Sequence, residues 1–188
     1  MTRLQRLFSF WVYGGFILSF LLLALLFIYA SSLTLLEILL CLHLPAYMWH
    51  QYEEHDGDRF KAYLDQRFFP EILNQGAIFF INVIGVWALF AILILMALNG
   101  PIGLGLGVAY LTFFNAITHV ISAAKFRSYN PGLLTSIIFF IPISGYALVQ
   151  AIFLDEIPLA YHIIGLVVGI GVHALIVMYA LVRLKKLK

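Results

Sequence analysis

Residues 8–30 read FSFWVYGGFILSFLLLALLFIYA, a run of 23 residues without a charged side chain. At a rise of 1.5 Å per residue, a helix of this length crosses a hydrocarbon core of about 30 Å. The apolar region of a signal peptide is shorter, about 7–15 residues. We therefore expect this segment to be a retained membrane-spanning helix.

The composition of the whole chain agrees with this interpretation. Of its 188 residues, 63% are hydrophobic and 11% are charged, whereas a soluble domain is about half apolar and about a quarter charged. This composition excludes a soluble globular protein. The single cysteine, Cys41, excludes an internal disulfide.

Charged and turn-forming residues divide the chain into six apolar segments. The predicted spans are residues 8–30, 33–49, 76–98, 101–124, 133–153 and 157–182. Their hydrophobicity is continuous rather than alternating, which favours helices over a β-barrel. We predict an all-α fold, a single polytopic transmembrane helix bundle over residues 1–188, with a polar cytoplasmic segment at 50–75.

The distribution of positive charge supports six spans. If the N-terminus is cytoplasmic, all 11 Lys and Arg residues fall on the cytoplasmic side, and the opposite loops, which include Asp155 and Glu156, contain none. The positive-inside rule then predicts that both termini are cytoplasmic, in an inner membrane of the bacterial type. Residues 59–69 alternate basic and aromatic side chains and predict an interfacial helix on anionic lipid. A net charge of +2 gives no reason to expect a nucleic-acid partner.

Several polar side chains are predicted to meet in the cytoplasmic half of the bilayer. Polar groups at this depth are costly and mark functional sites. Four helices contribute them: His50, Glu53 and Glu54; Asn82; Asn115 and His119; and His173. The spacing i, i+4 places His50 and Glu54 on one helix face, and likewise Asn115 and His119.

Four ordered motifs resemble those of the HXXEE-domain membrane proteins. They are His50-Gln51-Tyr52-Glu53-Glu54, Phe69-Pro70, Asn115-Ala116-Ile117-Thr118-His119 and Tyr129-Asn130-Pro131-Gly132. The resemblance covers about residues 33–150. It implies a polytopic membrane protein with its site at these motifs, but it implies no particular chemistry.

Histidines and carboxylates that converge from several helices indicate a transition-metal site, because imidazole and carboxylate ligands suit Zn or Fe. We expect His50, Glu54 and His119 to be ligands and His173 to be a candidate fourth. Glu53 points about 100° away from Glu54 on a helix, so we assign it the role of general acid or base. Asn82 and Asn115 would orient the ligands.

Two functions fit these residues. The first is a membrane-embedded metalloenzyme that acts on a lipidic or other apolar molecule entering from the bilayer. The second is a small transporter or a pH- or ion-responsive regulatory partner, in which the same groups form a hydrogen-bond network.

Individual residues also have structural interpretations. Residues 50–55 fit a solvated helix end, and we expect His55, which precedes an Asp-Gly-Asp sequence, to lie on the surface. Asn115 and His119 fit an interhelical hydrogen bond. His173 fits a packing role in its glycine-containing helix.

Overall fold

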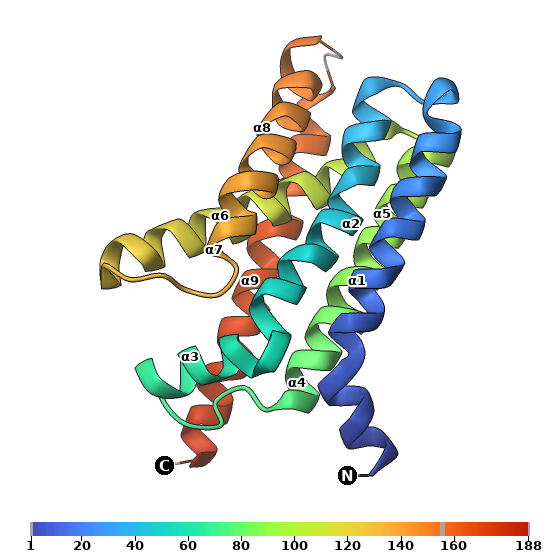
Figure 1. Cartoon of the computed structure of the whole chain (residues 1–188). Helices are drawn as coiled ribbons and strands as arrows, with labels where there is room; N and C mark the ends of the chain where they lie inside the picture. The colour runs from blue at the N-terminus through green and yellow to red at the C-terminus, as the bar shows by residue number, and fades with distance from the viewer. Residues whose placement is uncertain (1, 155–156, 188) are drawn as a thin grey trace.

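The computed structural model describes residues 2–154 and 157–187, so the acidic pair Asp155 and Glu156 lies outside the described residues. Within these ranges all regular secondary structure is helical, which confirms the all-α fold. Figure 1 shows long helices packed side by side, with both termini at the same end of the bundle. The α-helices are α1 (Arg3–Tyr29), α2 (Leu35–His55), α3 (Arg59–Arg67), α4 (Gln75–Phe79), α5 (Ala88–Asn99), α6 (Leu106–Phe126), α7 (Leu133–Thr135), α8 (Ile141–Val149) and α9 (Leu159–Leu187).

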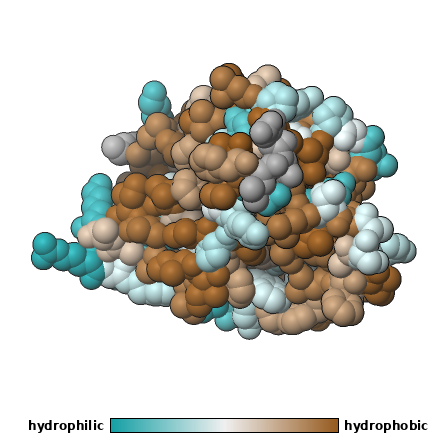
Figure 2. Space-filling view, turned by 90° about the horizontal axis from the view of Figure 1, so that it is seen from above, coloured by the Kyte–Doolittle hydropathy of each residue, from teal (hydrophilic) through white to brown (hydrophobic). Residues whose placement is uncertain are grey.

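Five helical segments are long and apolar enough to cross a membrane. They are Gln5–Ser32, Gln75–Asn99, Ile102–Phe126, Leu133–Phe153 and Leu159–Leu187. These five correspond to the first and to the third to sixth predicted spans. Large apolar side chains such as Ile17, Phe27 and Leu159 are exposed on their outer faces, and apolar residues predominate in the view along the bundle in Figure 2. Such a surface is typical of a membrane protein whose outer faces contact lipid.

The second predicted span, α2, is too polar to be among these five, yet it lies inside the bundle. Leu36, Leu40 and His43 are almost completely buried, and the helix lies between α1 and α8 (Figure 1). At its start Thr34 and Glu37 form a capping box, in which each side chain accepts the other's backbone N–H. Because protein rather than lipid surrounds α2, its polar residues are tolerated at this depth.

Helix α2 continues past residue 49, where the second predicted span ends, to His55, and His50, Gln51 and Glu54 are buried among neighbouring helices. The polar segment therefore begins after the candidate site and not at it.

A π-helical segment, Phe80–Trp87, joins α4 to α5. Asn82 and Trp87 are five residues apart, which is one hydrogen-bonded turn of a π-helix. Both side chains therefore reach Gln51 of α2: the Trp87 N–H donates to Gln51 Oε1, and Gln51 Nε2 donates to Asn82 Oδ1 at 2.7 Å.

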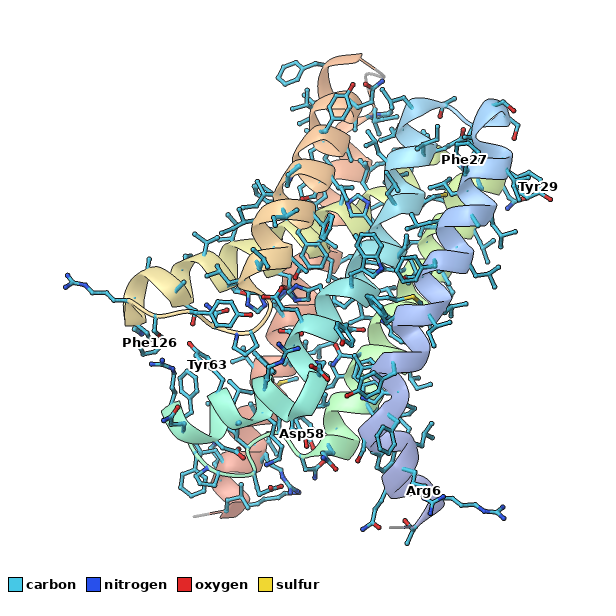
Figure 3. The ribbon with its side chains drawn as sticks, in the orientation of Figure 1. Arg6, Phe27, Tyr29, Asp58, Tyr63 and Phe126 are labelled. Carbon is cyan, nitrogen blue, oxygen red and sulfur yellow. The ribbon has the colours of Figure 1, made fainter. Side chains whose placement is uncertain are left out.

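Helix α3 confirms the helix predicted near residues 59–69 and is attached to the end of α6. The Tyr63 hydroxyl is 2.8 Å from Ser122 Oγ, and Arg67 donates to Ser128 Oγ at 2.7 Å. The Arg67 guanidinium also lies over the rings of Tyr63 and Phe126, at 4.7 and 4.8 Å from their centroids. Figure 3 shows Tyr63 and Phe126 facing each other across the space between α3 and α6.

The orientation of the chain is testable with single cysteines in a Cys41→Ala background. Ser32 and Ala62 are exposed and belong to opposite ends of the bundle (Figure 1). We expect a membrane-impermeant maleimide to label Ser32→Cys in intact cells and Ala62→Cys only after permeabilisation, because the basic residues favour the cytoplasmic side. The reverse pattern would show that the predicted orientation is wrong.

Candidate metal centre

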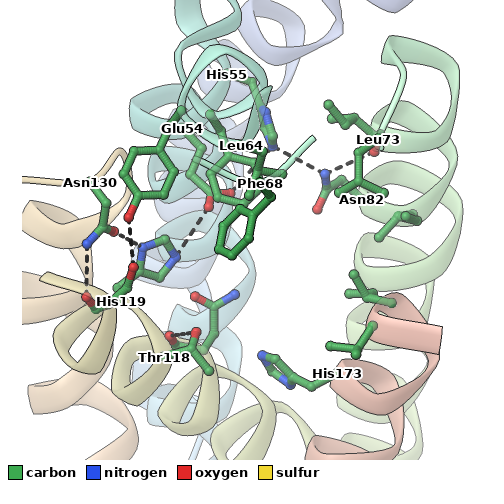
Figure 4. A pocket seen from close by; sticks show the side chains of 18 of the residues that line it. Glu54, His55, Leu64, Phe68, Leu73, Asn82, Thr118, His119, Asn130 and His173 are labelled. Carbon is green, nitrogen blue, oxygen red and sulfur yellow. Dashed lines mark hydrogen bonds and ion pairs between the residues drawn. The ribbon is translucent and has the colours of Figure 1, made fainter. Parts of the chain in front are cut away.

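Three predicted ligands meet in the interior. His50 Nε2 lies 3.5 Å from Glu54 Oε2, and His119 Nε2 lies 3.3 Å from Glu54 Oε1. One ligand atom from each of the three residues lies within 4.8 Å of the other two, and all three residues are buried. Figure 4 shows Glu54 of α2 facing His119 of α6.

These separations fit a shared ion. Zinc binds His nitrogen and carboxylate oxygen at about 2.0–2.2 Å in tetrahedral geometry, so two ligand atoms on one ion are about 3.4 Å apart. Both His–Glu distances are close to that spacing, although they end on different oxygens of Glu54. The group could therefore hold a metal ion.

The hydrogen bonds of His50 determine which ring nitrogen is free. Thr135 Oγ donates its single proton to Glu53 Oε2 at 2.5 Å or to the Gly132 carbonyl at 3.3 Å. It must therefore accept from His50 Nδ1–H, 2.9 Å away. The Nε2 atom of neutral His50 then carries the lone pair that points toward Glu54.

Asn130 determines which ring nitrogen of His119 carries a proton. Its Nδ2 donates to the His119 carbonyl at 2.9 Å, so its Oδ1 is the atom that faces His119 Nδ1 at 2.6 Å. The amide oxygen can only accept, so His119 Nδ1 carries a proton, and in the neutral ring Nε2 carries the lone pair.

In the neutral rings, the Nε2 lone pairs of His50 and His119 therefore both point toward the Glu54 carboxylate. An ionised carboxylate has no proton to donate to them. His50 Nε2 is buried and has no hydrogen-bond partner within the described part of the chain. Such an arrangement is costly unless a metal cation lies between the groups or a histidine takes up a proton at Nε2 and donates it to Glu54. The donor chemistry thus fits a metal ion.

Gly132 closes the site from the side of the loop that connects α6 to α7. It has φ +95°, a conformation that L side chains rarely adopt, and a Cβ atom there would lie 2.6 Å from His119 Cε1 and 2.7 Å from His50 Cε1. The Tyr-Asn-Pro-Gly motif thus places a bare backbone against both imidazole rings.

Glu53 does not point toward the three ligands. Its carboxylate accepts the backbone N–H groups of Leu134 and Thr135, at 3.0 and 2.8 Å, and the Tyr129 hydroxyl at 2.6 Å. It therefore caps the first turn of α7. Burial and the hydrogen bond to Glu53 raise the pKa of Tyr129, so its phenol remains a donor at neutral pH.

The expectation that His55 lies on the surface is wrong. His55 is buried, and its Nε2 lies 3.4 Å from Glu54 Oε2. Asn82 Nδ2 is 3.3 Å from the same nitrogen, and the chain from Trp87 through Gln51 orients that amide. The π-helical turn that carries Asn82 has no signal in the sequence, which explains why the burial of His55 was missed.

A cavity of about 390 Å³ lies beside the ligands. Glu54, His55 and His119 form part of its wall, and most other lining residues are apolar (Figure 4). The aromatic side chains of α3 cover it on one side: Phe60 and Tyr63 are among its lining residues.

The remaining predicted residues line this cavity but lie outside the ligand group. His173 Nδ1 is 2.8 Å from the Gly169 carbonyl of its own helix, and Asn115 Nδ2 donates to the Tyr47 hydroxyl at 3.5 Å. Asn82 contacts His55. Among the described residues, the groups that orient the two ligand histidines are instead Thr135 and Asn130.

A test of the close backbone approach is Gly132→Ala. We expect Zn²⁺ affinity to fall by at least about tenfold, as for other changes to groups around a metal ligand, because the new Cβ would displace both rings. Competition with a chromophoric chelator in detergent would measure the change. The matched control is Gly57→Ala: Gly57 also has positive φ, +62°, but a Cβ there meets no heavy atom within 4 Å. Equal affinities of the two variants would contradict this role for Gly132.

Thr135→Val tests the link between Glu53 and His50. The change removes the hydroxyl and leaves His50 Nδ1–H without its acceptor, so Zn²⁺ affinity should fall about 10–100-fold. Thr112→Val is the control, because Thr112 is even more buried than the partly buried Thr135 but its hydroxyl bonds only carbonyls of its own helix. If both variants bind Zn²⁺ as the unaltered protein does, Thr135 does not orient the ligand.

Comparison with known protein families identifies one match. The family described as "Protein of unknown function with HXXEE motif" matches residues 41–147, more than half of the chain. No curated protein and no solved structure matched the sequence. The matched region contains all three candidate ligands and the groups that orient them, and this chain belongs to the HXXEE family.

Proposed function

We propose that this protein is a membrane-embedded metalloenzyme that acts on a lipidic or other apolar molecule. The observation that carries the proposal is the buried group of His50, Glu54 and His119, whose free lone pairs converge beside an apolar cavity. A cavity of 300–1,000 Å³ with a few polar groups on apolar walls is typical of small-molecule sites.

The ligand set favours zinc or iron over magnesium or calcium, because two of its three members are imidazoles. Three protein ligands leave a position open, as in catalytic rather than structural zinc sites. When bound, such a metal supplies Lewis acidity and lowers the pKa of bound water. The reaction class stays open between hydrolysis and oxidation.

The residues of the chain itself have separate tasks in this proposal. Glu53 acts as a positioning residue: through Thr135 it keeps His50 in the tautomer that can bind metal, and its contacts with α7 secure the loop that carries Gly132. The cavity walls exclude water and accept the apolar part of the substrate. The inner membrane of the bacterial type, with both termini cytoplasmic, is the location we propose from the charge distribution.

Elemental analysis of detergent-purified protein tests the metal directly. We expect about one equivalent of Zn or Fe for a single three-ligand site, and loss of that metal in His50→Ala and in His119→Ala. The control is His162→Ala, which removes a buried histidine bonded to Tyr110 and outside the ligand group.

Two results would overturn the proposal. One is an absence of metal from the unaltered protein together with a failure to take it up on reconstitution. The other is a metal content in His50→Ala and His119→Ala that equals that of the His162→Ala control. The polar group would then be a hydrogen-bond network, and proton-linked transport or pH sensing would be the function to assay.

A further inference from the structure

A second hollow adjoins the cavity on the membrane-facing side. It has a volume of about 490 Å³ and lies between α6 and α9. Thr118, His173 and Val177 line both the cavity and this groove, so they form the boundary between the two. A molecule in the groove would therefore need to pass only these side chains to reach the wall that carries Glu54 and His119.

The groove faces the apolar outer surface of α9. Ile170, Val177, Met178 and Leu181 line it, and each of these side chains is at least half exposed. Only 11% of the residues in the most apolar part of α9 are buried. In a bilayer this surface meets acyl chains, so an apolar chain can occupy the groove without passing through water.

The two polar groups at the boundary, His173 and Thr118, are acceptors, and the neighbouring Asn115 in the cavity adds another acceptor beside its amide N–H donors. His173 Nδ1 must donate to the Gly169 carbonyl, which leaves the lone pair of the neutral ring on Nε2. The Thr118 hydroxyl donates its proton to the Asn115 carbonyl at 2.7 Å, so it too can only accept. Asn115 Oδ1 is a buried acceptor without a hydrogen-bond partner among the described residues.

A ligand complementary to His173 and Thr118 therefore brings a donor. A hydroxyl group can donate to His173 Nε2 or Asn115 Oδ1, whereas an ester, an ether or a carboxylate presents only lone pairs to them. An acceptor that loses contact with water and gains no donor penalises the ligand that covers it, so this arrangement discriminates against molecules without a donor.

We propose that the groove admits a long-chain alcohol from the bilayer, with its hydroxyl on His173 and its apolar chain between α6 and α9. This inference rests on the proposed function for what happens at the ligand group, but binding in the groove is separable from it. His173 is in this view a substrate-binding residue and not a fourth metal ligand.

The probe for the test is a long-chain fatty alcohol with a diazirine near the end of its chain, added to the full-length protein in lipid vesicles. After irradiation, we expect mass spectrometry to place most adducts on α6 and α9. Unlabelled fatty alcohol should compete about tenfold better than its methyl ether, the effect of one lost hydrogen bond to the partly buried His173.

Variants locate the binding site. His173→Phe should reduce labelling about tenfold without changing the metal content, because the ring shape is kept and the acceptor is lost. Ala174→Trp, on the groove wall, should block labelling. The matched control Leu175→Trp adds a similar ring at the next residue, which is 60% exposed and does not line the groove, and it should label normally.

The outcomes separate this inference from the proposed function. Normal groove labelling in His50→Ala protein, or in protein that binds no metal, would support the alcohol site without supporting the metal centre. Normal metal content with equal competition by alcohol and ether would overturn the inference and leave the metal centre standing. Loss of metal in His173→Phe would also overturn it, because His173 would then be a ligand.

Discussion

The Glu54 carboxylate is the group on which the interior of this protein depends. It is buried, and the Nε2 atoms of three histidines surround it at 3.3–3.5 Å. A buried carboxylate needs compensating charge or hydrogen bonds. Two of those nitrogens present lone pairs because Thr135 and Asn130 hold their protons on the opposite side of each ring. A metal cation between these groups would satisfy both lone pairs and the carboxylate, and protonation of a histidine is the alternative. The metal proposal thus draws on the hydrogen-bond pattern as well as on the residue types.

The two adjacent glutamates of the motif illustrate how one helix serves two purposes. Because side chains at successive helical positions point about 100° apart, Glu54 faces the ligands while Glu53 faces the start of α7. Glu53 therefore ties the loop with Gly132 to α2, and that loop packs directly on the two imidazole rings. Glu53 thus contributes to the site indirectly, through its hydrogen bonds to the backbone of α7 and to the Thr135 hydroxyl.

Much of the site could be predicted because helical spacing and topology constrain it strongly. The pairing of His50 with Glu54 follows from the i, i+4 interval, and the alternating direction of successive spans brings His119 to a similar depth. His55 could not be placed in this way, since its burial depends on a π-helical turn and on Asn82 and Gln51 from two different helices. Thr135 and Asn130 were missed because neither has a distinctive spacing relative to the histidines that it orients.

The sequence by itself determined that the chain forms apolar helices, where most of them begin and end, and which residue types meet at their polar ends, because hydrophobicity and turn-forming residues are local properties. Only the tertiary structure decided that the polar helix α2 lies inside the bundle, that Glu53 meets the start of α7, and that His173 lies across the cavity from the other histidines (Figure 4). These outcomes depend on contacts between segments far apart in the chain. The rotation of each helix about its axis follows from such packing and leaves little trace in the order of the residues.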